Sequence, residues 1–481
     1  MRSCRRGGRC DEVRDGAGGV SGPVGQARWA LAAMSLVLGL VVLDETVVGV
    51  ALPRIQAELG FTPTAAHWVV NAYLLTFTCF VALAGRLADL FGRGPSFLAG
   101  LALFAAGSLA AALAADGTML IAARALQGCG AAILFPAGFA VLTAIFPPDR
   151  RGAALGLQTT VGGIFMAAGP LLGGALAEHL SWRWIFWLNL PLLAAILGTF
   201  LLAWRIVAAT GPQPGRRTGD IRGRPRIDWP GLALLLAGLT ALTLGLMESG
   251  RWGWGSLPVL LLLAGGVAGL AAFLWLEARR RQPLLHVALL RIPTFAGGVI
   301  VFFMFQFDKI TVFIFVPLYL QQVLGLSPVD AGLPVLAAVL PSLVTSLLAG
   351  RAADRLGSRL PATIGLAANG FALLLIGLAT TLGSLPLVVG ALLLWGAVLP
   401  VIAVPSRRAL MGAVPPEHQG QASGVNLTVQ MMGGTLGLAL CTSVLAATGS
   451  YLPVFLLTGV LVLACLAAVW GMMERPGGRP A

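Results

Sequence analysis

A single lysine stands in the middle of a long apolar run. Lys309 is the only lysine of this chain and directly follows Asp308, inside the stretch from Thr294 to Gln322. A charged side chain at bilayer depth is costly unless it faces a cavity or a partner. The two residues therefore predict a buried polar site inside a membrane protein, where an acid and a base can bind a proton, a charged compound or each other.

Three more charged residues fall within apolar runs at a similar depth. At about 1.5 Å per helical residue, one layer slightly outside the middle of the membrane holds Asp44, Glu45, Arg124, Asp308 and Lys309. Burial favours the neutral form of a carboxylate, whereas a nearby cation favours its charged form. A carboxylate that moves between the two surroundings can carry a proton. We therefore expect a proton-coupling site in this layer, with Asp44 as the first candidate for the carrier.

Alternative roles remain open for these charges. Asp44 and Arg124 could form a fixed ion pair that only holds two helices together. Adjacent helical residues point about 100° apart, so Lys309 can pair with Asp44 or Glu45 of the other run as readily as with a local acid. Lys309 can also either bind substrate or merely neutralise an acid. Arg124 is expected to hold or tune a carboxylate rather than to contact substrate.

The composition is that of a membrane protein. Hydrophobic residues make up 57% of the chain and charged residues only 11%, against about 25% charged residues in soluble domains. A membrane span needs about 20 mostly apolar residues, and the runs that meet this requirement are 29–51, 66–88, 96–115, 118–145, 153–177, 184–204, 229–247, 256–276, 294–320, 331–350, 361–381, 384–404, 422–447 and 452–473. We therefore expect an all-α integral membrane protein of fourteen transmembrane helices.

The arginines predict the orientation of these spans. An even number of spans places both ends of the chain on one side. If that side is the cytoplasm, Arg54, Arg183 and Arg251 fall outside, Arg124 and Lys309 lie within spans, and the remaining basic residues fall in inner tails and loops. This is the positive-inside bias. The net charge of +13 then follows from topology and requires no nucleic acid, and we expect a multi-pass plasma-membrane protein with both termini cytoplasmic.

Two sequence motifs occur twice. GRLADLFGR, which starts at Gly85, recurs as GRAADRLGSR, which starts at Gly350; the matching residues include Arg86, Asp89 and Gly92 in the first copy, which ends at Arg93, and Arg351, Asp354 and Gly357 in the second. PPDRRGAALG from Pro147 recurs as PPEHQGQASG from Pro415. The repeats predict a cytoplasmic tail (1–28), an N-terminal six-helix bundle (29–205), a linker with two extra spans (206–292), a C-terminal six-helix bundle (293–473) and a cytoplasmic tail (474–481).

Five motifs in this order resemble one family. They are LDETVVGVALP (Leu43–Pro53), GRLADLFGR, RALQGCGAA (Arg124–Ala132), GPLLGG (Gly169–Gly174) and WRWIFWLNLP (Trp182–Pro191). With them the chain resembles the fourteen-span drug:proton antiporter family of the major facilitator superfamily, from residue 29 to nearly its end. It departs from the family pattern at Glu45 and Gly49, which replace a small and an amide residue, at Gly94, which replaces a basic residue, and at Phe165, which replaces a glycine.

The resemblance implies a fold and a function. Two bundles in repeat, with a substrate site between them, would alternate access to the two sides of the membrane. The implied function is proton-driven export of small amphipathic or cationic compounds, with the arginine of the fourth span, Arg124, taking part in proton coupling. The strip Gly169, Pro170, Gly173 and Gly174 would lie at the contact between the halves, although ordinary close packing of small residues also explains it. The Asp89 and Asp354 loops would close the inner gate.

Other functions remain to be separated from export. A facilitator or importer could use this fold without proton antiport, and a membrane sensor could use it without transport. An enzyme is not expected: the only lysine follows an aspartate, so no Walker A motif exists, and the four histidines form no metal pair. We expect no cofactor and no metal. The expected partners are a small-molecule substrate, protons and the lipid bilayer, with the protein a monomer.

Overall fold

The part of the chain that the structure describes forms fourteen membrane-length helices. The computed structural model describes residues 23–209, 228–280, 283–415 and 418–473. Residues 1–22 and 474–481 of the predicted tails and residues 210–227 of the predicted linker segment lie outside them, and residues 23–28, predicted as tail, are part of the first helix. The helices are α1 (Pro23–Leu59), α2 (Pro63–Phe91), α3 (Arg93–Ala112), α4 (Gly117–Ile145), α5 (Pro148–His179), α6 (Arg183–Ala209), α7 (Trp229–Trp252), α8 (Leu257–Arg279), α9 (Pro293–Gln322), α10 (Pro328–Leu356), α11 (Arg359–Leu382), α12 (Leu385–Gly412), α13 (Gln419–Thr448) and α14 (Tyr451–Met472). All fourteen are long and apolar enough to cross a membrane, which confirms the predicted fold class.

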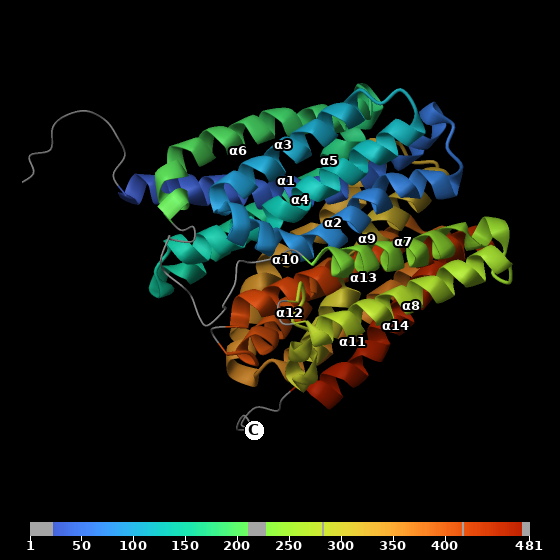
Figure 1. Ribbon diagram of the computed structural model, residues 1–481. Coiled ribbons are helices and arrows are strands. Elements are labelled where there is room, and N and C mark those ends of the chain that lie inside the picture. Colours follow the sequence, from blue (N-terminus) through green and yellow to red (C-terminus); the bar gives the residue numbers. More distant parts are fainter. Residues whose placement is uncertain (1–22, 210–227, 281–282, 416–417, 474–481) are drawn as a thin grey trace, which may run out of the picture.

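The helices form two bundles that repeat each other's packing (Figure 1). In the first bundle α1 packs against α5 and α6, and α3 packs against α4 and α6. In the second, α9 packs against α13 and α14, and α11 packs against α12 and α14. Each of these contacts is the counterpart of one in the other bundle. The sequence repeat is thus also a repeat in space.

The two bundles meet closely where glycines remove side chains from their seam. A Cβ added to Gly49 of α1 would lie 2.5 Å from the carbonyl oxygen of Phe313 on α9. A Cβ added to Gly174 of α5 would lie 2.5 Å from the carbonyl oxygen of Pro328 on α10. These contacts lie near the C-terminal ends of α1, α5 and α9. We call this side of the protein the outer end, because the predicted topology places it outside the cell.

Side chains also hydrogen-bond across the seam at this outer end. Glu178, near the end of α5, accepts a hydrogen bond from the backbone N–H of Val329 at 3.0 Å. Gln321, near the end of α9, donates its amide to the carbonyl oxygen of Val50 at 2.8 Å. The structure therefore describes a state in which the outer end of the seam is closed.

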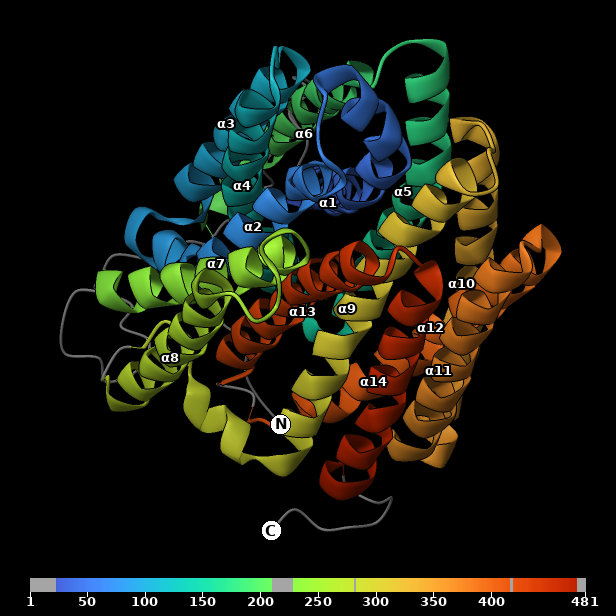
Figure 2. The same ribbon diagram turned by 90° about the vertical axis from the view of Figure 1, so that its right-hand side faces the viewer.

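The extra pair of helices packs against both bundles. α7 contacts α2 of the first bundle and α13 of the second, and α8 packs on α7 (Figure 2). The side-chain amide of Asn71 on α2 lies 3.1 Å from the sulfur of Met247 on α7. The hydroxyl of Ser249 on α7 hydrogen-bonds that of Ser443 on α13. The α7–α8 hairpin thus covers the seam between α2 and α13.

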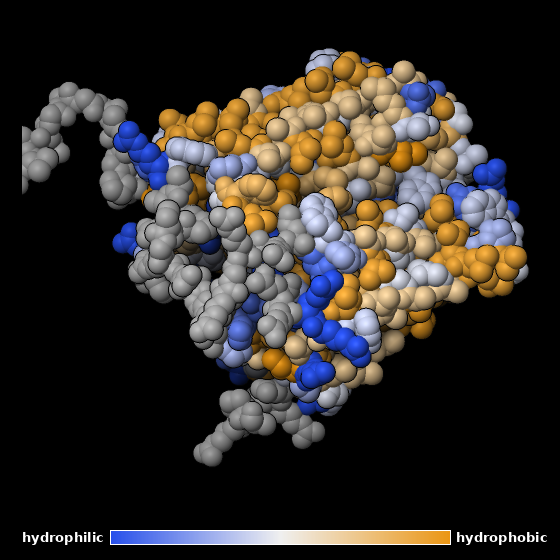
Figure 3. All heavy atoms as spheres, in the orientation of Figure 1, coloured by the Kyte–Doolittle hydropathy of each residue, from blue (hydrophilic) through white to orange (hydrophobic). Residues whose placement is uncertain are grey.

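Apolar side chains cover most of the face shown in Figure 3, and hydrophilic side chains gather towards the ends of the helices. Large apolar residues of α8 are among the most exposed: Leu257 is 68% exposed and Leu261 62%. Such a surface is unfavourable in water and suits the hydrocarbon of a bilayer. The outer face of α8 is therefore a lipid-facing surface.

Candidate functional site

Asp44 of α1 and Arg124 of α4 form an ion pair in the core of the first bundle. The Nη1 atom of Arg124 lies 2.6 Å from Oδ2 of Asp44, and both side chains are 0% exposed. Two charges at this depth require each other, because an uncompensated buried charge is far costlier than a paired one. The pair brings together two of the five charges that the sequence placed in one layer.

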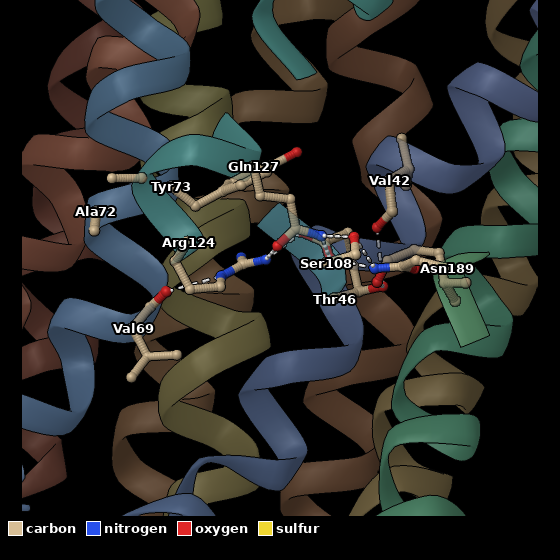
Figure 4. A network of polar contacts seen from close by, with 12 residues as sticks. Val42, Thr46, Val69, Ala72, Tyr73, Ser108, Arg124, Gln127 and Asn189 are labelled. Carbon is tan, nitrogen blue, oxygen red and sulfur yellow. Dashed lines mark hydrogen bonds and ion pairs between the residues drawn. The ribbon is translucent and has the colours of Figure 1, made fainter. Parts of the chain in front are cut away.

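Three neutral side chains complete the surroundings of Asp44: Gln127, Ser108 and Asn189, which Figure 4 labels beside Arg124. Gln127 of α4 donates to Oδ1 of Asp44 at 2.8 Å, and Asn189 of α6 donates to the same oxygen at 3.2 Å. Both amides also donate to the hydroxyl of Ser108 on α3, at 3.0 and 3.3 Å. Asp44 thus accepts hydrogen bonds from three side chains on two helices, an arrangement suited to the ionised carboxylate.

Arg124 makes further contacts that fix its orientation. Its Nε atom donates to the carbonyl oxygen of Val69 on α2 at 3.0 Å. Its guanidinium lies over the ring of Tyr73, 4.4 Å from the centroid, and 5.7 Å from that of Phe186. Its Nη2 atom finds no hydrogen-bond partner among the described residues. Arg124 therefore joins α1, α2 and α4, and its Nη2 atom remains available for a further hydrogen bond.

Glu45 and Lys309 form a second ion pair, which joins the two bundles. The Nζ atom of Lys309 on α9 lies 2.8 Å from Oε2 of Glu45 on α1. The Glu45 side chain is 3% exposed and that of Lys309 10%. Of the partners that the sequence left open for Lys309, the structure places Glu45 beside it. Because α1 and α9 belong to different bundles, any motion that parts these helices must also part this pair.

Asp308 lies apart from both pairs. Its side chain is 0% exposed and points into the second bundle, where the amide of Asn369 on α11 donates to Oδ2. The other oxygen, Oδ1, has no hydrogen-bond partner among the described residues. The five charges of the predicted layer are therefore divided among three places: one inside each bundle and one between them.

The glycine strip of α5 faces two different helices. Cβ atoms added to Gly169 and Gly173 would meet Thr46 and Val47 of α1, in the same bundle, whereas Gly174 faces α10 of the other bundle. Pro170, within this strip, presents its carbonyl oxygen to Gly332 of α10 at the same seam. The strip thus packs α5 both inside its bundle and across the seam.

Phe165 occupies the place of the family's glycine without a clash. Its ring lies over Gly39 of α1, where an added Cβ would approach the ring atoms to 2.8 Å. A missing side chain on α1 therefore makes room for an added one on α5. Another departure from the family pattern, Gly94 in place of a basic residue, lies under the indole ring of Trp204, to which an added Cβ would approach to 2.9 Å.

The two repeated inner motifs make different contacts. Arg86 of the first donates to the carbonyl oxygen of Pro283, in the segment between α8 and α9, at 2.7 Å. Asp354 of the second forms an exposed ion pair with Arg408 of α12. The side chain of Asp89 lies outside the described part of the structure. Gly92 and Gly357 end α2 and α10 with φ values of 85° and 75°, which favour glycine.

A histidine lies close to the first inner motif. His286, in the segment between α8 and α9, is half-buried. Burial is the main cause that lowers its pKa, and the positive charges of Arg86 and His418 lower it further. The ring therefore favours its neutral form beside these bases.

The neutral residues around the acids were not among the residues predicted from the sequence. Gln127 follows Arg124 by three positions and therefore shares its helix face. Asn189 lies within the WRWIFWLNLP motif, and Asn369 is an amide inside an apolar helix. Polar side chains inside predicted spans are rare enough to indicate a site, and this signal could have found all three.

Comparisons with known proteins identify relatives over almost the whole chain. The family model described as Major Facilitator Superfamily matches residues 34–301 and 295–481. The chain is 37% identical to the cephamycin export protein CmcT of Amycolatopsis lactamdurans, over 85% of this chain and 83% of that protein. It is also 37% identical to the puromycin resistance protein pur8 of Streptomyces alboniger, over 90% of this chain and 84% of that protein.

More distant relatives share the fold. The chain is 33% identical to the multidrug resistance protein Stp of Mycobacterium tuberculosis, over 87% of this chain and 75% of that protein. Among solved structures, a D-xylose-proton symporter superposes with a TM-score of 0.67 at 14% identity, over 94% of this chain and 99% of that one. At that identity the likeness concerns the fold alone.

Proposed function

The chain belongs to the major facilitator superfamily of membrane transport proteins, which are not enzymes, and we propose that it exports antibiotics or other small amphipathic or cationic compounds in exchange for protons. The substrate class rests on relatives that are named for exporting a cephamycin and for resistance to puromycin. The observation that carries proton exchange is the fully buried Asp44–Arg124 pair with its three neutral partners.

The proposed proton carrier is Asp44. While Asp44 is ionised, its charge balances Arg124 and the pair is stable. Protonation removes that balance, so the Arg124 guanidinium must turn to its other partners or to water. Uptake of a proton from the outer side would then favour one arrangement of α1 and α4. Its release to the inner side would favour the other. This exchange would couple proton entry to compound exit.

The proposed gate lies where the bundles touch. The Glu45–Lys309 pair and the close contact of Gly174 with Pro328 hold α1 to α9 and α5 to α10. Both contacts must separate for the outer end to open. The fit of Phe165 over Gly39 keeps α5 packed on α1, so this departure from the family pattern leaves the glycine strip of α5 in place.

Transport assays separate export from the alternatives. We expect expression of this chain to raise resistance to puromycin, and purified protein in vesicles to exchange puromycin at a rate that follows an imposed pH gradient. Flux that ignores the gradient would instead indicate a facilitator. Absence of flux for puromycin, ethidium and a cephamycin, from protein that is folded and inserted, would contradict transport of this class and favour a sensor.

The inner motifs are proposed to hold the inner gate. Asp89→Asn and Asp354→Asn should each shift the protein towards the inward-facing state, with the larger effect at Asp89, whose motif is fuller. The pair of Asp354 with Arg408 is exposed, and exposed pairs contribute about 0.2–1 kcal/mol, so labelling of cysteines placed at the inner halves of the helices should change by about 1.5- to 5-fold.

A control variant exists for the second motif. Arg408→Gln breaks the same ion pair from the other helix and should reproduce the shift of Asp354→Asn. If neither aspartate variant alters the labelling, the arginines of these loops serve membrane topology alone.

A further inference from the structure

Asp308 is a buried acid with no cation beside it. It is 0% exposed, and the ammonium group of Lys309, the next residue, is directed to Glu45 at 2.8 Å. No ion pair of Asp308 occurs among the described residues. By contrast, Asp44 has Arg124 at 2.6 Å. Asp44 and Asp308 each point into the core of their own bundle, but only Asp44 has a cation beside its carboxylate.

The two aspartates occupy corresponding places in the two bundles. Asp44 on α1 is surrounded by α3, α4 and α6, through Ser108, Gln127 and Asn189. Asp308 on α9 is faced by α11, α12 and α14, through Asn369, Trp395 and Cys465. These three helices are the repeat counterparts of α3, α4 and α6. The second bundle thus contains a polar pocket of the same construction as the first.

The repeat also shows what replaces the arginine. At the offset that relates Pro147 to Pro415, Gln127 corresponds to Trp395 and Arg124 corresponds to Leu392. Leu392 is 0% exposed. Where the first bundle supplies a guanidinium to its aspartate, the second supplies an apolar side chain. Among the described residues, the charged or titratable neighbours of Asp308 are Lys309, the next residue on its own helix, whose ammonium is directed to Glu45, and the thiol of Cys465 on α14.

Around Asp308 the described residues leave two buried acceptors unpaired but only one donor, the indole N–H of Trp395, so the hydrogen bonds are one donor short. The amide nitrogen of Asn369 donates to Oδ2, while Oδ1 of Asp308 and Oδ1 of Asn369 are both buried acceptors without a partner in the described chain. Unpaired buried acceptors are costly. A proton on Oδ1 of Asp308 turns that acceptor into a donor, and the free amide oxygen of Asn369 is the acceptor it needs.

We propose that Asp308 is a second proton-binding site, neutral while the outer end is closed, and that each transport cycle therefore carries two protons. In this state Asp308 is a carboxylic acid paired with the Asn369 amide. When the helices of the second bundle rearrange, the O–H bond breaks and the proton leaves to the inner water; a proton from the outer water re-forms the bond. An ionised carboxylate without a cation is strongly disfavoured in an apolar core. Asp308 can therefore release its proton only when the surrounding helices rearrange. The transport part of this proposal rests on the proposed function; proton binding does not.

Infrared difference spectroscopy on the purified full-length protein tests proton binding without any substrate. At neutral pH the wild type should show the carbonyl band of a buried protonated carboxyl group. The band should disappear in Asp308→Asn and remain in Asp44→Asn, the matched control. Leu392→Arg supplies the missing cation and should also remove the band while Asp308 is still present. A wild-type spectrum that Asp308→Asn leaves unchanged would overturn the proposal.

Ethidium, a monovalent cation, tests whether the proton moves. Exchange of one proton for one ethidium carries no net charge, whereas exchange of two protons carries one positive charge inward. An electrical potential alone, without a pH gradient, should therefore drive ethidium efflux by the wild type and not by Asp308→Asn. Potential-driven efflux that persists in the variant would refute the second proton. If the wild type moves no ethidium at all, that result counts against the proposed function, and the infrared band still decides proton binding.

Discussion

Asp44→Asn is expected to abolish accumulation driven by a pH gradient. Asparagine has nearly the volume of aspartate and keeps one oxygen for the amides of Gln127 and Asn189, but it cannot titrate. The carrier proposed above would then be lost, and accumulation of puromycin in inverted vesicles should fall to the level of vesicles without the protein. Exchange of labelled for unlabelled puromycin needs no net proton movement and should persist.

The exchange assay is one control for Asp44→Asn, and Asp116→Asn is another. Asp116 is exposed and caps the N-terminus of α4 at the outer end, a place where asparagine caps equally well. This variant should pump normally. If Asp44→Asn accumulates puromycin against its gradient at the wild-type rate, Asp44 is not the carrier, and Glu45 and then Asp308 become the candidates.

Lys309→Met is expected to cost far more alone than together with Glu45→Gln. Methionine keeps the apolar bulk of the lysine stem but leaves the Glu45 carboxylate without its partner at 3% exposure. Removing one member of a buried pair costs about 3–5 kcal/mol, whereas replacing both is often nearly neutral. Thermal unfolding of the two single variants and the double variant should therefore show strong coupling. Additive losses would mean that the pair contributes nothing beyond its separate residues.

The same variant distinguishes two roles for Lys309. If the lysine only neutralises Glu45, Lys309→Met should move the pH optimum of transport upward for a cationic compound such as ethidium, because a stranded acid needs a higher pH to ionise. If the lysine binds substrate, affinity for an anionic cephamycin should fall and the pH optimum should stay. An unchanged pH profile together with unchanged affinities would remove Lys309 from both roles.

The sequence predicted the helices well because their signal is local. A run of about 20 apolar residues is typical of a membrane-spanning helix. Every predicted span coincides with one helix, and the bounds agree to within a few residues except where a helix is longer than predicted, as α1 is. The depth of the charged residues was inferred from helical rise in the same local way, and it stays a prediction. Both inferences need only spacing along one helix.

The sequence offered the Asp44–Arg124 and Glu45–Lys309 pairs as alternatives but could not choose among them, because the pairing depends on how each helix is rotated about its axis. Asp44 and Glu45 are neighbours in the chain, yet one points into its bundle and the other across the seam. Asp308 and Lys309 divide in the same way. The lack of a cation near Asp308 depends on Leu392 of α12, a residue that carries no signal by itself in a leucine-rich sequence.

The hairpin of α7 and α8 makes the two flanks of this transporter unequal. Because α7 lies over α2 and α13, a compound dissolved in the bilayer meets a helical wall on that flank. On the opposite flank α5 and α10 meet directly, through Gly174 against Pro328 and Gly332 against Pro170, and no hairpin of the described residues lies across them. A lipophilic compound of the kind that the proposed function implies would therefore meet two different surfaces when it approaches the seam from the lipid: the α7–α8 hairpin on one flank and the direct α5–α10 contact on the other.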